Sequence, residues 1–448
     1  MAHPFKISLN NFRAFAETDQ VSIRPLTLLV GENSTGKTSF LSALRFAFDL
    51  KNIKTESYFN EYPFELGSYE DIAHDSINGK TSDRFSVSIE KQIDINKSLI
   101  FRINSLEHEN VIYAKMTFFF KSYFGYVVVS SIELQLEQGQ LNFHFSEEGN
   151  VFIKSEDDII NLSGRQRDLF SNITGTKYIN NITSALYFLM DFRFGRENPD
   201  WTPAQRKLVE LFSSAFDSFI NTEYSIVCSP PVRSVPRSVY TRSDDSGTKE
   251  PSNAPHELNR LKRADRRRWN KLHSGLSRFG KLSGLFTRFD IKKLTAHDSG
   301  PFQVKVMVRG RSSTIADVGY GVSQALPIMT DILEAGSKPT AFLLQQPEVH
   351  LHPKAQASLG TMFSEFISKN SKGYIIAETH SDYLVDRIRI DVREGRLNCH
   401  NVNIIYFHAG ENSIEIHEIS IDKQGNLTNC PDGYRDFFIR EQERVLGF

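Results

Sequence analysis

Cysteine is scarce in this sequence of 448 residues, and long apolar runs are missing. The three cysteines, Cys228, Cys399 and Cys430, are far apart, show no metal-ligand spacing and are odd in number, which disfavours a disulfide scaffold. No apolar run reaches the roughly 20 residues that a membrane-spanning helix needs. The opening MAHPFKISLNNF also lacks the apolar core of a secretory signal. We therefore expect a soluble cytoplasmic protein that has no membrane partner.

Charge of one sign is not in excess either, because the formal net charge is -1. No overall electrostatic field therefore points to nucleic acid or to a membrane, and local charge has to be considered by itself. The chain also lacks an internal repeat. Its length and its apolar content of 40% predict one large domain or two to three ordinary ones.

A phosphate-binding loop is the clearest feature that the sequence does contain. The stretch GENSTGKTSF begins at Gly31, directly after the apolar run LTLLV, and leads into a segment with helical periodicity. Small residues between Gly31 and Gly36 let backbone N–H groups wrap phosphates, and the helix adds its positive N-terminal end. Lys37 then supplies a charge to the phosphates, and the Thr38 hydroxyl can ligate magnesium. This context predicts nucleotide binding.

The rest of the chain alternates between strand-like and helical blocks. Residues 85–153 are rich in β-branched and aromatic residues and predict antiparallel strands. Residues 156–222 are expected to be mainly helical, with one helix starting at Thr202 and Pro203. Residues 229–256 are rich in proline and serine and predict an exposed loop. We expect an ATPase lobe at 1–155, a helical arm with a basic segment at 156–295, and a second lobe at 296–448.

Three further motifs stand near the ends of apolar stretches. DVGYGVSQALPIM places Ser323 near a helix start, which fits either phosphate binding or a structural turn. AFLLQQPEVHLHP is a strand that ends at Gln345, Gln346 and Glu348. YIIAETHSDYL is another strand, which ends at Glu378, Thr379 and His380. Ligands gather at the carboxyl ends of parallel strands, so these residues are expected to lie together.

With these motifs in this order, the sequence resembles ABC-type ATPases of the RecF/SMC/OLD group. More narrowly, it is similar to stand-alone ATPases that are related to OLD proteins but lack the OLD nuclease domain. The motifs that carry the resemblance are LNNFRAFAE, LLVGENSTGKTSFL, DVGYGVSQALPI, PEVHLHP and AETHSDYLVDRIR. They cover roughly residues 1–50 and 300–430. The resemblance implies an α/β fold, a P-loop ABC-ATPase head with an antiparallel β subdomain and a helical insertion.

The resemblance also implies roles for individual residues, with ATP and Mg²⁺ as cofactors. The catalytic candidates are Glu348, His380 as the switch histidine, Gln345 and Gln346, and the metal candidates are Thr38 and Gln345. His350 to Pro353 would lie in the D-loop. The signature of one copy would complete the nucleotide site of another, so at least a head-to-tail homodimer is implied. The nucleotide-binding candidates are Gly31, Asn33, Ser34, Thr35, Gly36, Lys37, Thr38 and Ser39 of Walker A, and Gly321, Val322, Ser323 and Gln324 of the signature.

Two other motifs leave alternatives open. His350 and His352 alternate and could ligate zinc, but no third or fourth ligand is evident nearby, and the D-loop pattern accounts for both without metal. Glu70 and Asp71 stand where such ATPases often place the Q-loop. No glutamine is present there, and a solvated loop explains the segment equally well.

Gln345 occupies a position where relatives of this subgroup often have glutamate. An amide can bind a metal-bound water but brings no negative charge, so metal retention and water activation should both be weaker. Three interpretations follow. In the first, Glu348 or Glu378 supplies the missing charge and the enzyme is slow. In the second, the protein is an ATP-binding clamp with little turnover. In the third, Gln345 is a deliberate replacement that traps ATP. We favour a function that includes ATP hydrolysis.

A basic segment from His256 to Lys293 carries 12 Lys and Arg against 3 Asp and Glu. Basic residues, including those from Arg260 to Lys293, are interleaved with Trp269, Phe279 and Phe286, which suits phosphate backbones and unstacked bases. The alternative is a solvated helix with an apolar stripe toward the core, made of Leu258, Leu261, Trp269 and Leu272. An acidic protein partner would give the same pattern.

The resemblance suggests an ATP-driven sensor and regulator of a separate nuclease effector in bacterial anti-phage defence, as in PARIS and Septu systems. No Asp-x-Asp pair follows His380, so nuclease chemistry is expected on another chain. The alternative is a RecF-like DNA-repair ATPase that clamps DNA directly. A third possibility is an inert scaffold that binds ATP without turnover.

Overall fold

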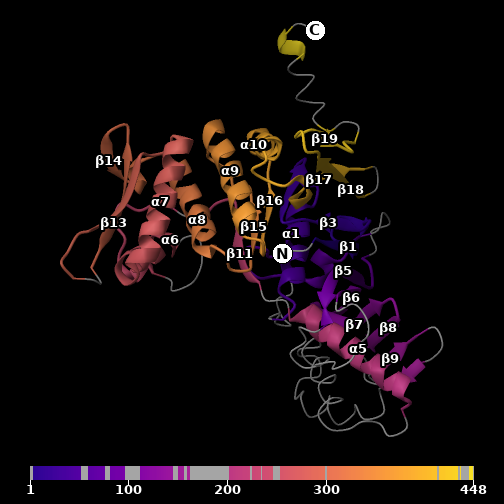
Figure 1. Cartoon of the computed structure of the whole chain (residues 1–448). Helices are drawn as coiled ribbons and strands as arrows, with labels where there is room; N and C mark the ends of the chain where they lie inside the picture. Colours follow the sequence, from indigo (N-terminus) through magenta and orange to yellow (C-terminus); the bar gives the residue numbers. More distant parts are fainter. Residues whose placement is uncertain are drawn as a thin grey trace.

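The computed structural model is organised around three sheets and the helices between them (Figure 1). The described residues are 4–51, 59–75, 81–95, 111–144, 150–155, 159–161, 201–221, 224–233, 235–245, 253–297, 300–410, 413–431, 434 and 443–446.

An antiparallel sheet forms one arm of the molecule. Within the described residues it has nine strands in the order β10-β9-β8-β7-β6-β5-β1-β2, and β3 also pairs with β1. Alternating apolar residues on β5 and β6 produce it, since every second side chain turns into the core. The strands are β1 (Phe5–Phe12), β2 (Phe15–Glu17), β3 (Val21–Ile23), β5 (Phe85–Asp94), β6 (Val111–Tyr123), β7 (Tyr126–Leu136), β8 (Gly139–His144), β9 (Asn150–Lys154) and β10 (Ile159–Asn161).

A second, mainly parallel sheet lies at the centre. Among the described residues its order is β11-β15-β16-β4-β17-β18-β19, and the pairs from β11 to β17 are parallel. Its strands β15 and β16 are buried along their full length, as expected for a sheet that is covered on both faces. The strands are β4 (Leu26–Gly31), β11 (Ser225–Ser229), β15 (Thr340–Gln345), β16 (Gly373–Glu378), β17 (Val402–Ala409), β18 (Ile414–Ile421) and β19 (Leu427–Thr428).

Two hydrophobic cores lie on opposite faces of the central sheet. Leu29 and Leu343 face one core, which they share with α1, α5 and the antiparallel sheet. Leu28 and Phe342 face the other core, with α6 to α10 and the third sheet. The helices are α1 (Lys37–Phe48), α2 (Tyr69–Ile72), α5 (Pro203–Ile220), α6 (Ala254–Ala264), α7 (Arg266–Ser283), α8 (Tyr320–Ala335), α9 (Pro353–Lys369) and α10 (Asp382–Arg393), with 3-10 turns at Arg242–Asp244, Ile315–Asp317 and Cys399–Asn401.

The third sheet is small and antiparallel, with the order β12 (Arg288–Lys293), β13 (Phe302–Val308) and β14 (Arg311–Thr314). It stands beside α6 and α7 at the end of the molecule that is opposite to α5 (Figure 1). Its inner face belongs to the second core through residues such as Phe289 and Val304.

The structure confirms the predicted α/β class and the antiparallel β subdomain. The helix start at Thr202 is also confirmed, because the Thr202 hydroxyl accepts a hydrogen bond from Gln205 N and Pro203 is the first helical residue. Residues 162–200 of the predicted arm lie outside the described residues, and the divisions at residues 155 and 295 stay predictions.

One prediction is only partly right. The stretch 229–256 was expected to be an exposed loop, and Val232, Val235 and Val239 are indeed exposed, but Ser229, Arg233, Tyr240 and Ala254 are buried. Its prolines and serines do interrupt regular structure, as such residues do. Arg233 nevertheless packs against α8 and the end of β15, where it finds hydrogen-bond partners.

Candidate nucleotide site

The loop between β4 and α1 depends on two glycines. Gly31 has φ of 139° and Gly36 has φ of 80°, a region that favours glycine. A Cβ at Gly31 would lie 2.2 Å from the Phe407 carbonyl oxygen, and one at Gly36 would lie 2.7 Å from the Phe15 ring. Any side chain at either position would therefore collide with a neighbouring element. The close approach keeps the loop tight around the first turn of α1.

The Lys37 side chain is buried beneath this loop. Its ammonium donates hydrogen bonds to Gly31 O at 3.1 Å, to Glu32 O, and to Thr35 Oγ1 at 3.4 Å. Burial lowers the pKa of Lys37, while Glu378 and Glu32 act in the opposite direction. The loop carbonyls thus hold the Lys37 ammonium at the start of α1. This cation and the positive N-terminal end of the helix dipole both favour an anion at that place.

The other small residues of the loop take different positions. Asn33 and Ser34 are exposed at its tip, and Thr35 is buried, with its hydroxyl donating to Glu32 O at 2.8 Å. Ser39 is buried in the first turn of α1 and its hydroxyl accepts a hydrogen bond from Arg13 Nε at 3.4 Å.

One carboxylate meets the start of α1, and a second lies beside His380. Thr38 Oγ1 donates to Glu378 Oε2 at 2.9 Å, and Glu348 Oε1 accepts from the backbone N–H of His380 at 2.8 Å. Burial raises the pKa of Glu378 and also that of Glu348. His380 as a whole residue is exposed, but its ring is partly buried. This partial burial, together with the Lys37 charge, lowers the pKa of His380. Perturbed groups at one strand edge are typical of functional sites.

The glutamines lie beside these acids. Gln345 is opposite Glu378 in the parallel ladder between β15 and β16. Its Nε2 is buried and has no hydrogen-bond partner in the described part of the chain. Gln346 adopts φ of 42°, and its N–H donates to Glu378 O at 2.9 Å. The structure therefore brings Gln345, Gln346, Glu348 and Glu378 to the same sheet edge as the glycine loop.

Arg233 was missed by the sequence reasoning and joins this site to α8. Its side chain is only 3% exposed. One guanidinium nitrogen, Nη2, donates to Gln345 O at 3.0 Å and to Gln346 O at 2.9 Å. Nη1 donates to Gln324 O at 3.3 Å, and Arg233 N donates to Gln324 Oε1 at 2.8 Å. No local pattern marks this residue, because its partners come from distant parts of the chain.

The predicted signature residues form the first turn of α8. Ser323 is buried, and its hydroxyl donates to Tyr320 O at 2.8 Å. Gly321 packs so closely on the following motif that a Cβ there would lie 2.7 Å from His350 O. His352 caps α9, with Nδ1 accepting from Lys354 N at 3.3 Å. The segments predicted to be the signature and the D-loop are therefore in direct contact within one chain.

The segment that contains Glu70 and Asp71 forms the short helix α2. Asp71 accepts hydrogen bonds from Ser68 N and Ser68 Oγ, each at 2.8 Å, and so caps that helix. Arg13 bridges α2 to the glycine loop, because its Nη1 donates to Asp71 O at 2.6 Å and its Nε to Ser39. A Q-loop role for this segment stays a prediction.

The aromatic residues of the basic segment do not lie on the surface. Trp269, Phe279 and Phe286 are all buried in the second core. The expectation that they stack on unpaired bases is therefore wrong, and the apolar stripe of Leu258, Leu261, Trp269 and Leu272 is confirmed. Packing against β12 and α8 accounts for their burial.

Comparison with known proteins identifies the family. Residues 5–385 match the AAA ATPase domain family. The chain belongs to this family. ATP binding follows from that membership, and membership also indicates ATP hydrolysis. No curated protein sequence matches this AAA ATPase.

Solved structures were also compared with this AAA ATPase. An SmcHead bound to the C-winged helix domain of ScpA has a TM-score of 0.46 and 12% identity, covering 94% of this chain and 98% of that chain. An Smc head domain with an extended coiled coil bound to the C-terminal domain of ScpA, from Pyrococcus furiosus, has a TM-score of 0.43 and 12% identity, with 99% and 100% covered. An SMC head domain from Thermotoga maritima has a TM-score of 0.37 and 11% identity, with 94% and 99% covered.

No helix in the described part of this AAA ATPase is long and apolar enough to cross a membrane.

Proposed function

We propose that two copies of this chain hold ATP between them and hydrolyse it slowly. Lys37 and Thr38 of one copy would grip the phosphates, and Ser323 of the other copy would close the site. The observation that carries the proposal is the meeting of Lys37 and Thr38 with Glu378 at one edge of the central sheet, next to which Glu348 accepts a hydrogen bond from His380 N. Ligand sites of open α/β sheets occur at such edges.

Magnesium fits this edge chemically. The Thr38 hydroxyl and the Glu378 carboxylate offer oxygen ligands, which Mg²⁺ prefers. The buried and unpartnered Gln345 Nε2 could donate to a phosphate oxygen, and Gln345 Oε1 would remain free to accept from a metal-bound water. When bound with ATP, Mg²⁺ neutralises charge that develops on the phosphates.

The chain's own residues divide the remaining work. Glu348, with its raised pKa and its link to His380 N, is the candidate base that accepts a proton from the attacking water. Gln345 would orient that water without adding charge. His380, whose lowered pKa favours the neutral imidazole, would stand near the terminal phosphate.

A complementation experiment tests the shared site. Lys37→Ala and Ser323→Arg chains are each expected to be inactive alone. Their equal mixture would contain dimers with one intact site, so about a quarter of the wild-type rate should return. Melting curves must show that both variants are folded, and Ser323→Ala, which removes only the hydroxyl, serves as a milder second variant. If the mixture stays inactive while both variants are folded, the shared site is wrong.

We also propose that the ATPase regulates a separate nuclease effector in anti-phage defence. The order of the motifs, from LLVGENSTGKTSFL to AETHSDYLVDRIR, supports this role through its similarity to stand-alone OLD-like ATPases. Co-expression with the protein encoded by the neighbouring gene tests it. A stable complex whose nuclease activity differs between wild type and Lys37→Ala is expected. A neighbour that does not bind, or whose activity ignores Lys37→Ala, would reject the regulatory role and leave the ATPase unaffected.

A further inference from the structure

We propose that the outer face of the third sheet binds the phosphate backbone of double-stranded nucleic acid. This surface, named the basic face, includes the end of α6 and the strands β12 and β13. Its cations are Lys262, Arg263, Arg288, Lys292, Lys293 and Lys305.

Strand alternation creates the basic face. On β12, Phe289 and Ile291 turn into the core, so Arg288, Asp290 and Lys292 turn outward. On β13 the inward residues Val304 and Val306 leave Lys305 on the outer side. Pairing brings the outward side chains of neighbouring strands together, with Asp290 opposite Lys305.

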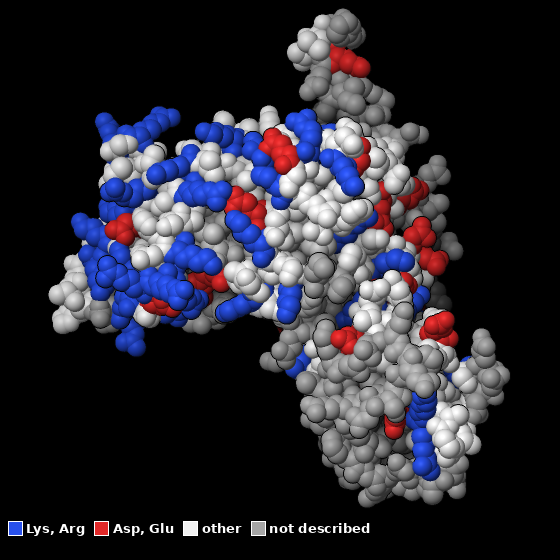
Figure 2. Space-filling view, viewed as in Figure 1, with Lys and Arg blue, Asp and Glu red and all other residues white. Residues whose placement is uncertain are grey.

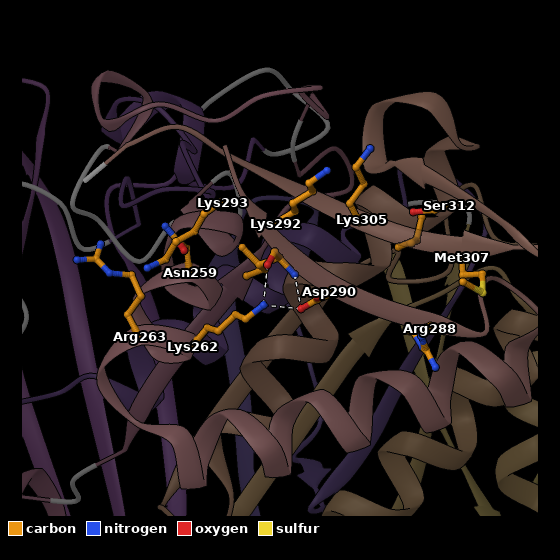
Figure 3. A pocket seen from close by; sticks show the side chains of 12 residues that line it. Asn259, Lys262, Arg263, Arg288, Asp290, Lys292, Lys293, Lys305, Met307 and Ser312 are labelled. Atoms are coloured by element: carbon orange, nitrogen blue, oxygen red, sulfur yellow. Dashed lines mark hydrogen bonds and ion pairs between the residues drawn. The ribbon is translucent and has the colours of Figure 1, made fainter. Parts of the chain in front are cut away.

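The basic face is hollowed into an open groove of about 850 Å³. Six of its twelve lining residues are Lys or Arg, and Asp290 is the one acid among them. Figure 3 shows Lys292 and Lys305 extending away from the sheet on the same side. Asp290 is already engaged, because it accepts from Lys262 Nζ at 2.5 Å. Within the described residues no ion pair involves Arg288 or Lys292, so their charge is available to an anion. Lys305 also forms no ion pair there, although its charge, after the hydrogen bonds from Thr314, helps to lower the pKa of the Asp317 carboxyl.

The charge is concentrated at one end of a nearly neutral chain. Figure 2 shows Lys and Arg side chains crowded over the end that carries α6, α7 and β13. Exposed cations of α7 add to this end, at Arg266, Arg267, Arg268 and Lys271. Because the whole chain has a formal net charge of -1, the local excess of cations does not follow from composition.

The lining favours nucleic acid over an acidic protein. Protein interfaces are usually anchored by apolar or aromatic side chains, whereas nucleic-acid interfaces are more polar and strongly basic. Of the apolar residues that line the groove, Ile291 and Val306 are buried and only Met307 is partly exposed. Uniform phosphates along a backbone match such a surface.

The same lining favours a duplex over a single strand. Single strands are usually held by stacking of bases on aromatic rings. Trp269, Phe286 and Phe289, which lie in this region, are committed to the core. Contacts to phosphate alone suit a duplex, which presents about one charge per 1.7 Å of its axis.

The experiment measures binding of a fluorescent duplex of about 20 base pairs between roughly 50 and 200 mM salt. The test variant combines Arg288→Gln, Lys292→Gln and Lys305→Gln. Loss of three phosphate contacts should reduce the slope of log K against log salt by about 2.7 and weaken binding at low salt at least tenfold. The control combines Lys207→Gln, Lys372→Gln and Lys423→Gln, exposed lysines outside the groove with the same total charge change.

Equal affinity and equal slope of the two triple variants would overturn the proposal. Tighter binding of a single strand than of the duplex would also overturn it. The same holds if polyglutamate displaces the labelled duplex as effectively as unlabelled duplex does. Duplex DNA and duplex RNA are compared in separate arms, and binding of either supports the proposal. The measurement is repeated with Lys37→Ala. We expect this variant to bind the duplex as the wild type does, because the basic face and the nucleotide site lie on different elements.

Discussion

The Thr38 hydroxyl donates a 2.9 Å hydrogen bond to the Glu378 carboxylate, which joins the first turn of α1 to the end of β16. The two residues are 340 positions apart in the chain. Because the carboxylate is buried beside a buried ammonium, the arrangement keeps opposite charges at the carboxyl edge of the sheet.

Removing the Lys37 charge should abolish tight nucleotide binding. A hydrogen bond to a charged group contributes roughly 1.5–3 kcal/mol, so Lys37→Ala should weaken ATP binding by about tenfold to a hundredfold. Titration calorimetry with Mg-ATP measures the change. Lys372→Ala, which removes an exposed lysine elsewhere, is the control and should bind as the wild type does. Unchanged affinity of Lys37→Ala would place the nucleotide elsewhere.

Placing a second acid beside Glu378 should raise turnover. Gln345→Glu adds a carboxylate at the strand position opposite Glu378, where it can hold a metal-bound water. Positioned acids and bases contribute typically about 10²–10⁴-fold, so a rise of kcat of at least about tenfold is expected. Phosphate release is measured, with Gln345→Glu combined with Lys37→Ala as the control for contaminating ATPases. No gain from Gln345→Glu would favour an inert scaffold.

Neutralising Glu348 should stabilise the protein while it removes turnover. Burial raises the pKa of Glu348, so the folded state binds its proton more tightly than the unfolded state does. The ionised carboxylate therefore destabilises the fold above the ordinary pKa of 4.5, and this effect disappears as the pH falls below it. Glu348→Gln should raise the free energy of unfolding at pH 8, with a smaller gain at pH 5.

Urea unfolding of Glu348→Gln at the two pH values provides the check. Glu137→Gln, which changes an exposed glutamate on the surface, is the control for the removal of one carboxylate. A loss of stability at pH 8 would mean that the carboxylate makes stronger contacts than its link to His380 N.

Arg233 should hold the α8 start and the β15 end together. Burial lowers the pKa of Arg233 to about 10, so it remains charged at neutral pH. Arg233→Met leaves the carbonyls of Gln324, Gln345 and Gln346 without this donor, and unpaired buried groups cost about 1–3 kcal/mol each. A loss of about 2–4 kcal/mol of stability and a lower kcat are expected.

The matched control is Arg237→Met, on the same segment, because the Arg237 side chain is 59% exposed and pairs with Asp244. Surface pairs of this kind contribute about 0–1 kcal/mol. Arg233→Lys should recover part of the stability. If kcat falls in Arg233→Met while stability and KM do not change, Arg233 acts on the chemistry and not on the fold.

The amino-acid sequence by itself determined the local features of this AAA ATPase. Gly31, Gly36, Lys37 and Thr38 lie within one turn and one loop, so their spacing constrains the backbone without help from the rest of the fold. The cap at Thr202 and the alternation on β12 are local for the same reason. These patterns predicted the glycine loop, a helix start and the α/β class.

Only the tertiary structure decided which distant residues meet. The bond between Thr38 and Glu378 depends on β16 lying next to β4, an order that no local pattern encodes. Burial of Arg233 in a proline-rich stretch and of Trp269 in a basic helix likewise depends on what packs against them. A side chain's exposure is set by its neighbours in space, and those neighbours come from segments tens to hundreds of residues away.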